Sequence, residues 1–325
     1  MGCTSQLSLG GEVLRHDMHE RGYNELQHGI PSDQIDHLVE TYASFTLNHP
    51  DPLPSTMDAM LPDSPLHQLK KQLDELDRSQ DTQDEWHKFR TNTPGIGKPN
   101  GYSSRSAQIA VLRRARGIDL FDEEPKEFYH YTPHHYADVT RAHKDYGWSD
   151  PPIEVRQLNN AFAPIHKRAS ELIMKIAGLI EETHPEARNI FDVESLRNSP
   201  VRLVFYPPHT SDLLGAGHYD KSTLTIQIAE SHEGLRVAPN KDTPLQLVRR
   251  DADSAVIFPG TDLANKLDDN TVYQPGWHDI IRLNTPNKGR GMPIRAIEVC
   301  ARWALIFFAN GSNFVNPDKL LTHTR

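Results

Sequence analysis

Two side chains placed two residues apart could hold a metal ion. His218 and Asp220 stand in the segment Gly217-His-Tyr-Asp220. In an extended segment, residues two apart point to the same face, so this imidazole and this carboxylate can be directed at one point. A histidine from a distant strand would complete a set of two histidines and one carboxylate. Such a set leaves adjacent metal positions open and is typical of non-haem iron(II) oxygenases.

The His-x-Asp pattern also fits a structural role. The chain has 18 histidines, so a chance match is not rare. His218 could end a strand, with Asp220 in a turn beside Lys221. The choice between a metal site and a turn therefore depends on the flanking sequence.

The flanking sequence resembles a known family. The run His218-Tyr-Asp-Lys-Ser-Thr-Leu-Thr-Ile-Gln227, followed by Gly234-Leu-Arg-Val237, is similar to the core of the isopenicillin N synthase-like branch of the 2-oxoglutarate/iron(II) dioxygenases. Upstream, Arg202-Leu-Val-Phe-Tyr-Pro207 resembles the strand of that family that ends in Tyr-Tyr-Pro. Downstream, Phe258-Pro-Gly-Thr-Asp-Leu263 resembles its Gly-Asp segment. The resemblance covers roughly residues 122 to 317.

The resemblance implies a third ligand several tens of residues beyond the aspartate. His278 follows Asp220 by 278 − 220 = 58 residues. His232 is too close, and His323 lies at the end of the sequence. His218, Asp220 and His278 are therefore the expected iron ligands.

The resemblance also implies an arginine that binds the co-substrate 2-oxoglutarate. Arg302 begins the apolar run Arg302-Trp-Ala-Leu-Ile-Phe-Phe308, which matches the last core strand of the family. A rigid guanidinium can bind the distal carboxylate of 2-oxoglutarate through two hydrogen bonds. Ala304 stands where the family has a serine, so one hydroxyl contact is missing. Tyr206 could supply a compensating hydrogen bond.

Two other arginines compete for this role. Arg282 follows the expected ligand strand closely, and Arg295 follows a loop that contains prolines. We favour Arg302 because it alone opens the matching strand.

The elements that position these residues change in type along the chain. Residues 1 to about 120 predict a mostly helical region and a candidate substrate cover. One helix is expected from Ser32 through Phe45 and another from Leu66 through Leu76. Residues 121–325 predict the oxygenase core, with a long helix over about 152–182, where apolar residues recur every three and four positions.

The rest of the core predicts strands. Strand-like runs lie at residues 201–206, 222–228, 245–248, 255–258, 296–299 and 303–308. Short strands separated by turn residues indicate a sandwich or barrel. We therefore expect an α+β fold, with a double-stranded β-helix (jelly roll) over about 200–310, a helical N-terminal region and a long supporting helix.

Composition limits the class of partner. The formal net charge is −9, which argues against nucleic acid as the main partner. Cys3 and Cys300 are the only cysteines, so neither a disulfide framework nor a Cys-x-x-Cys metal cluster is expected. No apolar run approaches the roughly 18 to 20 residues that span a bilayer. We expect a cytoplasmic protein with no obligate protein partner.

The resemblance implies iron(II), O2 and 2-oxoglutarate, with ascorbate as a helpful additive in vitro. The implied reaction hydroxylates or desaturates a small organic molecule and releases succinate and CO2. Two alternatives stay open. One is an iron(II) oxidase on the same fold that needs no 2-oxoglutarate, which Ala304 favours. The other is a non-catalytic jelly-roll binding protein.

Overall fold

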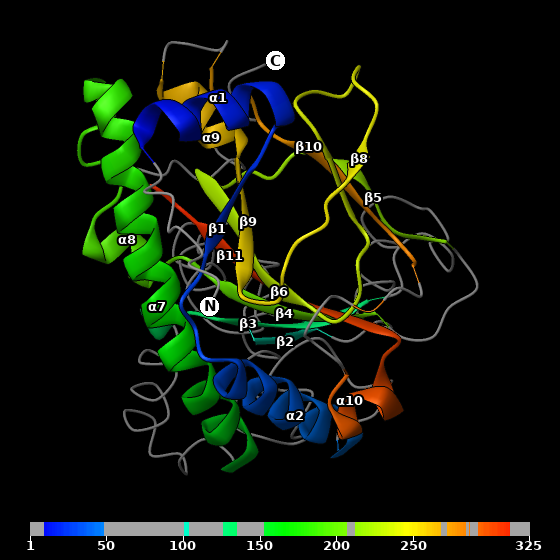
Figure 1. The fold of residues 1–325 in the computed structure, drawn as a ribbon. Helices are drawn as coiled ribbons and strands as arrows, with labels where there is room; N and C mark the ends of the chain where they lie inside the picture. Colours follow the sequence, from blue (N-terminus) through cyan, green and yellow to red (C-terminus); the bar gives the residue numbers. More distant parts are fainter. Residues whose placement is uncertain are drawn as a thin grey trace, which may run out of the picture.

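The strands form two antiparallel sheets that face each other. A computed structural model of the chain describes residues 10–48, 101–103, 126–134, 153–206, 212–267, 272–283, 286 and 292–312. The larger sheet has the order β1-β9-β6-β11-β4-β3-β2, and the smaller has the order β5-β10-β7-β8 (Figure 1). The strands of the larger sheet are β1 (Asn24–Gln27), β2 (Gly101–Ser103), β3 (Glu127–Tyr131), β4 (Val201–Tyr206), β6 (Leu224–Glu230), β9 (Ser254–Pro259) and β11 (Arg302–Ala309). Those of the smaller sheet are β5 (Leu213–His218), β7 (Leu235–Ala238), β8 (Gln246–Leu247) and β10 (Trp277–Ile281).

Along the chain, the strands alternate between the two sheets. From β4 to β11, the path runs from the larger to the smaller sheet and back, three times. This path and the antiparallel pairing make a double-stranded β-helix. The expected α+β jelly-roll fold is confirmed.

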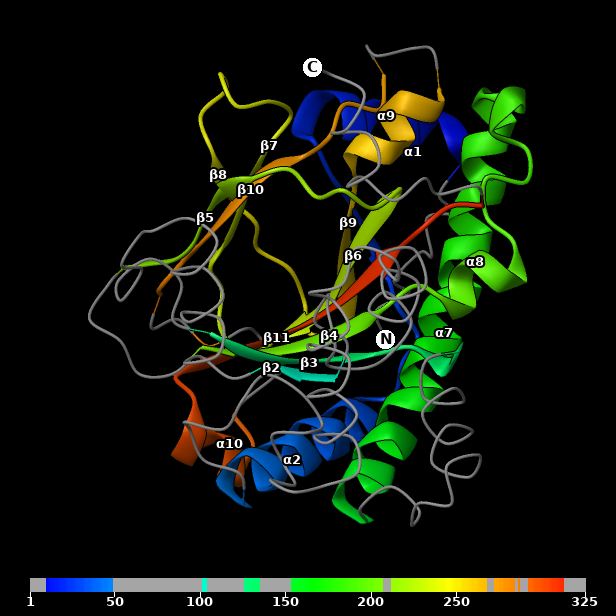
Figure 2. The same cartoon turned by 180° about the vertical axis from the view of Figure 1, so that it is seen from behind.

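Helices cover one face of the larger sheet (Figure 2). They are α1 (Gly11–Arg21), α2 (Ser32–Asn48) and α7 (Ile153–Thr183). The buried residues of α7 recur every three or four positions, and they include Leu158, Phe162, Ile165, Ala169, Ile173 and Ile176. They pack with the outward side chains of the larger sheet in one apolar cluster. The predicted long helix over 152–182 is therefore present as α7, and it supports the sheet from outside.

Short helices connect the remaining elements. They are η3 (Pro185–Ala187), α8 (Val193–Arg197), α9 (Thr261–Lys266) and α10 (Ile294–Val299). The strand predicted at residues 296–299 was wrong, because these residues form most of α10, which packs against α2. Its apolar residues suit either element over so short a length, and Pro293 stands at the start of the helix.

A second apolar cluster lies between the two sheets. It includes Val204, Tyr206, Leu235, Val256, Phe258, Ile280 and Ala304. Because side chains alternate along a strand, the residues between these positions face the helices instead. In β6, Leu224, Ile226 and Ile228 join the helical cluster, which leaves Thr225 and Gln227 directed into the jelly roll.

The N-terminal region contributes a strand to the larger sheet as well as helices. The helix expected from Ser32 is α2, but β1 was not predicted from the sequence, and it pairs with β9 at the edge of the larger sheet. The helix expected from Leu66 to Leu76 lies outside the described residues. The division at residue 120 stays a prediction. None of the described helices has the length and apolar character needed to cross a membrane.

Candidate metal centre

Three side chains from three segments meet at one end of the jelly roll. His218 ends β5, Asp220 follows two residues later, and His278 lies on β10, where it is paired directly with His218. One ligand atom from each residue lies within 4.8 Å of the others. His218 Nε2 is 3.6 Å from Asp220 Oδ1, and His278 Nε2 is 3.8 Å from Asp220 Oδ2. The structure thus brings together the three residues that the sequence predicted.

The other nitrogen of each histidine ring has a backbone partner. His218 Nδ1 is 2.8 Å from the carbonyl oxygen of Ala216, and His278 Nδ1 is 2.9 Å from that of Gly276. A carbonyl oxygen only accepts hydrogen bonds, so each Nδ1 carries the proton and donates it. In the neutral rings, both Nε2 lone pairs are then available to a metal ion. Hydrogen bonds of this kind fix the orientation of histidine ligands in metal sites.

Two hydroxyl groups hold the carboxylate of Asp220. Thr225 Oγ1, on the inner face of β6, donates to Asp220 Oδ2 at 2.7 Å. Ser222 Oγ lies 2.8 Å from Thr225 Oγ1. Since the single hydroxyl proton of Thr225 goes to the carboxylate, Ser222 is the donor in the second bond. Thr225 was not predicted as a site residue, although it lies within the segment that resembles the family.

The centre keeps its carboxylate charged. Burial alone would raise the pKa of Asp220, but the field of His278, the contacts with His218 and the hydrogen bond from Thr225 lower that pKa well below its usual range. Burial lowers the pKa of His278, which favours the neutral ring that a metal requires. Burial also acts to lower the pKa of His218, but Asp220 raises it overall. The donor set therefore has one negative charge, which suits a divalent cation.

Exposure differs among the three ligands. The side chain of His218 is 51% exposed, whereas those of Asp220 and His278 are 11% and 6% exposed. One side of the centre is therefore open to solvent and the other faces the interior. A small molecule could approach from the His218 side.

A glycine allows the loop that carries Asp220 to pack closely. A Cβ atom on Gly260 would lie 1.8 Å from the carbonyl oxygen of Ser222 and 3.1 Å from that of Asp220. The amide of the next residue, Thr261, donates to the same Asp220 oxygen at 2.8 Å. The close approach at Gly260 thus determines where the backbone of Asp220 lies.

The predicted co-substrate residues lie together deeper in the jelly roll. Arg302 at the start of β11 is paired with Tyr206 at the end of β4, and its guanidinium lies 5.2 Å from the centre of the Tyr206 ring. Tyr206 therefore contacts Arg302 through its ring face. Arg302 Nη2 donates to the buried carboxylate of Glu230, and Arg302 Nε donates to the carbonyl oxygen of His232 at 3.3 Å. The contact with Glu230 was not predicted from the sequence.

The two alternative arginines differ in position. Arg295 lies on α10, and its guanidinium donates to the hydroxyl of Ser44 on α2 at 2.7 Å, outside the jelly roll. Arg282 directly follows β10, and its Nε and Nη2 atoms are buried without a hydrogen-bond partner among the described residues. Arg295 is thus separated from the site, whereas Arg282 stays close to the end of the ligand strand.

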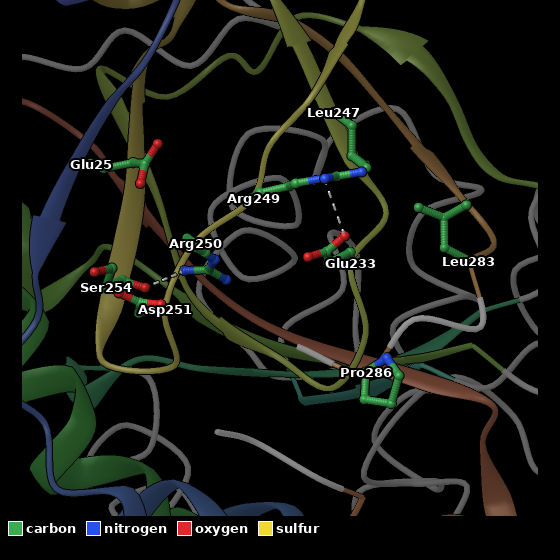
Figure 3. A pocket seen from close by; sticks show the side chains of 9 residues that line it. All are labelled: Glu25, Glu233, Leu247, Arg249, Arg250, Asp251, Ser254, Leu283 and Pro286. Atoms are coloured by element: carbon green, nitrogen blue, oxygen red, sulfur yellow. Dashed lines mark hydrogen bonds and ion pairs between the residues drawn. The ribbon is translucent and has the colours of Figure 1, made fainter. Parts of the chain in front are cut away.

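A cavity of about 550 Å³ opens at the other end of the jelly roll (Figure 3). Its lining comes from β1, the turn after β6, the segment from β8 to β9 and the residues after β10, and it includes Glu25, Glu233, Arg249, Arg250, Ser254 and Leu283. The metal-ligand candidates lie instead at the end of β5 and the start of β10. The cavity therefore opens away from the metal ligands, and Arg250 on its wall also contacts Glu230 inside the jelly roll.

The whole fold matches solved structures. It aligns with a full-length Neurospora crassa protein in complex with alpha-KG, at TM-score 0.56 and 15% identity over 93% of this chain and 78% of that one. It also aligns with the dioxygenase for auxin oxidation 1 of Arabidopsis thaliana in its 2-oxoglutarate complex, at TM-score 0.53 and 13% identity over 95% and 93%. JOX2 in complex with 2OG, Fe and JA aligns at TM-score 0.50 and 17% identity over 92% and 70%.

This chain has the fold of the 2-oxoglutarate/iron(II) oxygenases. No family model matches the sequence, and no curated protein matches it. The oxygenase fold is thus evident in the structure, while the fold does not single out the isopenicillin N synthase-like branch. Within this oxygenase fold, His218, Asp220 and His278 form a candidate facial triad.

Proposed function

We propose that this chain is an iron(II)- and 2-oxoglutarate-dependent oxygenase that acts on a small organic molecule. In the proposed reaction, 2-oxoglutarate and O2 yield succinate and CO2. One oxygen atom enters succinate, and the other either hydroxylates a substrate C–H bond or leaves as water after desaturation. The observation that carries the proposal is the convergence of His218, Asp220 and His278 within 4.8 Å in an oxygenase fold.

The residues present fit this chemistry. His218 and His278 offer Nε2 lone pairs, and Asp220 offers a negative oxygen, so these three would hold iron(II). Arg302 Nη1 is buried and has no hydrogen-bond partner among the described residues, so a donor remains for the distal carboxylate of 2-oxoglutarate. Bound iron and 2-oxoglutarate would supply the oxidising power. The chain would orient the substrate and exclude water around the reacting bond.

The test is succinate formation by anaerobically purified protein. The protein receives iron(II), 2-oxoglutarate and ascorbate, and air is then admitted. Wild-type protein is expected to form succinate, and His218→Ala is expected to form none. His19→Ala, which removes an exposed histidine on α1, is the matched control and should behave as wild type. Failure of the wild type to bind iron and 2-oxoglutarate would overturn the proposal.

An iron(II) oxidase that needs no 2-oxoglutarate is the second candidate. Ala304 and the Arg302–Glu230 ion pair favour it. The carboxylate of Glu230 already binds one nitrogen of the Arg302 guanidinium, which leaves fewer donors for 2-oxoglutarate. Iron binding without 2-oxoglutarate binding, together with oxygen consumption that needs no oxo acid, would support the oxidase. A non-catalytic binding protein would bind neither iron nor 2-oxoglutarate.

Three finer assignments belong to the same proposal. We place the chain in the isopenicillin N synthase-like branch, on its motifs around His218 and Arg302. Residues 1–120 are assigned as a substrate cover and residues 121–325 as the catalytic core. A small organic substrate is supported by the partly exposed His218 at the open side of the metal centre.

A further inference from the structure

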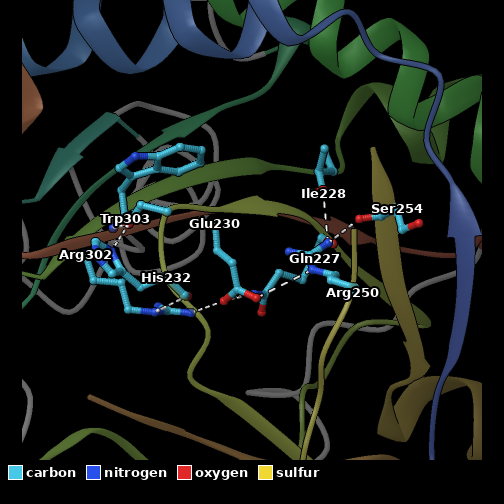
Figure 4. Close-up of polar contacts among 9 residues, drawn as sticks. Gln227, Ile228, Glu230, His232, Arg250, Ser254, Arg302 and Trp303 are labelled. Atoms are coloured by element: carbon cyan, nitrogen blue, oxygen red, sulfur yellow. Dashed lines mark hydrogen bonds and ion pairs between the residues drawn. The ribbon is translucent and has the colours of Figure 1, made fainter. Parts of the chain in front are cut away.

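A buried carboxylate links two arginines inside the jelly roll. Glu230, at the end of β6, has a side chain that is 1% exposed. Its Oε2 atom accepts from Arg302 Nη2 and from Gln227 Nε2, the latter at 2.7 Å. Its Oε1 atom lies 3.5 Å from Nε of Arg250. Figure 4 shows Arg302 and Arg250 on opposite sides of Glu230.

The backbone holds Arg250 firmly. Its Nη1 atom donates to the carbonyl oxygens of Gln227, Ile228 and Ser254, at 2.6, 3.1 and 2.7 Å (Figure 4). Its Nε and Nη2 atoms have no hydrogen-bond partner among the described residues. Nη1 of Arg250 thus binds the backbone, whereas Nε faces Glu230, and Nε and Nη2 remain available as donors.

The cluster has more positive than negative charge. Arg302 and Arg250 have side chains that are 3% and 1% exposed, and Glu230 is the one carboxylate that both contact among the described residues. Glu25 on β1 also acts on Arg250 through its charge, but its side chain is 31% exposed and pairs with Arg21. Among the almost fully buried side chains, two cations therefore face one anion, and an unpaired buried charge is costly. Buried donors remain on both arginines. One additional carboxylate would balance the charge and accept these hydrogen bonds.

The position of the cluster suits the far end of a dicarboxylate. Thr225, which binds Asp220, and Gln227, which binds Glu230, are successive inward residues of β6. Successive residues on one face of a strand lie about 7 Å apart. The cluster therefore begins one inward residue along β6 from the residue that binds Asp220, so a dicarboxylate held at the metal centre could extend along this strand toward it.

We propose that Arg250 and Glu230 belong to the co-substrate site. Arg250 is a second positioning residue for the distal carboxylate, and Glu230 is a resident carboxylate that aligns both arginines and limits their affinity for it. This inference rests on the proposed function. It predicts that removing the charge of Glu230 strengthens binding of 2-oxoglutarate, and that removing Arg250 weakens it.

The test is calorimetric titration of manganese(II)-loaded protein without oxygen, so no turnover is needed. Each protein is titrated with 2-oxoglutarate and with 2-oxopentanoate, which has the same chain length but no distal carboxylate. The ratio of the two dissociation constants within one protein does not depend on the fraction that is folded. The variants are Glu230→Gln, Arg250→Met and Arg250→Lys. Arg249→Met is the matched control, because Arg249 is the exposed neighbour on the same loop.

The expected changes in affinity are confined to 2-oxoglutarate. Glu230→Gln should bind it about tenfold more tightly, because a positive site loses its internal anion. Arg250→Met should bind it at least about tenfold more weakly, and Arg250→Lys should recover part of the loss. Arg249→Met should match wild type, and binding of 2-oxopentanoate should not change. The thermal midpoint of ligand-free Glu230→Gln should fall, because two buried arginines then face each other.

Three results would overturn the inference in distinguishable ways. If wild-type protein binds 2-oxoglutarate and Glu230→Gln binds it no more tightly, Glu230 is only structural, and the proposed function still stands. If wild-type protein binds 2-oxoglutarate no better than 2-oxopentanoate, the cluster receives no distal carboxylate. If manganese binds and neither oxo acid does, the inference and the proposed function both fail.

Discussion

Ala304 on β11 lies directly opposite Glu230 on β6, and both side chains are buried. The methyl group of Ala304 is small, so the space beside it is open to the longer side chain of Glu230. Glu230 pairs with Arg302, two residues before Ala304 on the same strand. Ala304, which stands where the family motif has a serine, and the Arg302–Glu230 ion pair therefore belong to one arrangement.

A larger residue at position 304 should disturb this arrangement. Ala304→Val adds two methyl groups where packing is already dense, so we expect the free energy of unfolding to fall by about 1–3 kcal/mol. Chemical denaturation of the metal-free protein measures the change. Ala304→Ser, which adds only a hydroxyl, serves as the control and should cost less. Equal stability of Ala304→Val and wild type would show that Glu230 does not depend on this space.

Loss of the hydroxyl that holds Asp220 should weaken metal binding. Thr225→Val keeps the shape of the side chain but removes the hydrogen bond to Asp220 Oδ2. Partners of this kind typically contribute about 10- to 100-fold to metal affinity. Competition with a chelator of known affinity for iron(II) measures the loss. Thr225→Ser should retain most of the affinity, and an unchanged affinity in Thr225→Val would contradict the role of this bond.

The close contact at Gly260 predicts a large effect from a single methyl group. In Gly260→Ala, the new Cβ would collide with the backbone of Ser222 and displace the loop of Asp220. We expect a loss of stability of more than about 2 kcal/mol and loss of the metal site. Gly178→Ala on α7 is the control, since its Cβ meets nothing within 4 Å. That control should instead gain about 0.5–1 kcal/mol, as alanine favours a helix.

Burial of His166 predicts a pH-dependent stability. Removal of its ring from water lowers the pKa of His166 to about 4, from the 6.5 of an exposed histidine. The folded protein thus binds this proton less readily than the unfolded chain. The contribution of His166 is complete above pH 6.5 and is lost as the pH falls toward 4. The loss amounts to about 3 kcal/mol.

The matched variant is His166→Gln, whose amide can still donate to the carbonyl oxygen of Ser199, 2.9 Å from His166 Nε2. Denaturation at pH values between 7 and 4 should show a shallower fall in stability for the variant than for wild type. Parallel curves would exclude His166 as the source of the acid sensitivity.

Local patterns predicted the parts of the structure that depend on local sequence. The buried apolar residues of α7 recur regularly, and apolar and polar residues alternate from Leu224 to Ile228 in β6, so both elements were predictable. The two-residue spacing of His218 and Asp220 likewise predicted that both side chains point to one side, although β5 itself ends at His218. Strand β1 was not predictable, because Asn24–Gln27 contains mostly polar residues and is stabilised by its pairing with β9.

Contacts between distant segments could not be predicted in this way. The charged partners of Glu230 are Arg250 and Arg302, which are 20 and 72 residues further along the chain. A charged residue at the end of an otherwise uncharged strand was the one available signal. It indicates a buried charge that needs a partner, but it does not identify the partner.

The most direct test of the metal centre is anaerobic dialysis against iron(II), followed by metal analysis. Wild-type protein and His19→Ala should each retain one iron per chain, whereas Asp220→Ala and His278→Ala should retain almost none. Thermal midpoints of the metal-free proteins would confirm that the variants are folded. Retention of one iron per chain by both ligand variants, or no retention by wild type, would contradict the assignment of His218, Asp220 and His278 as the metal centre.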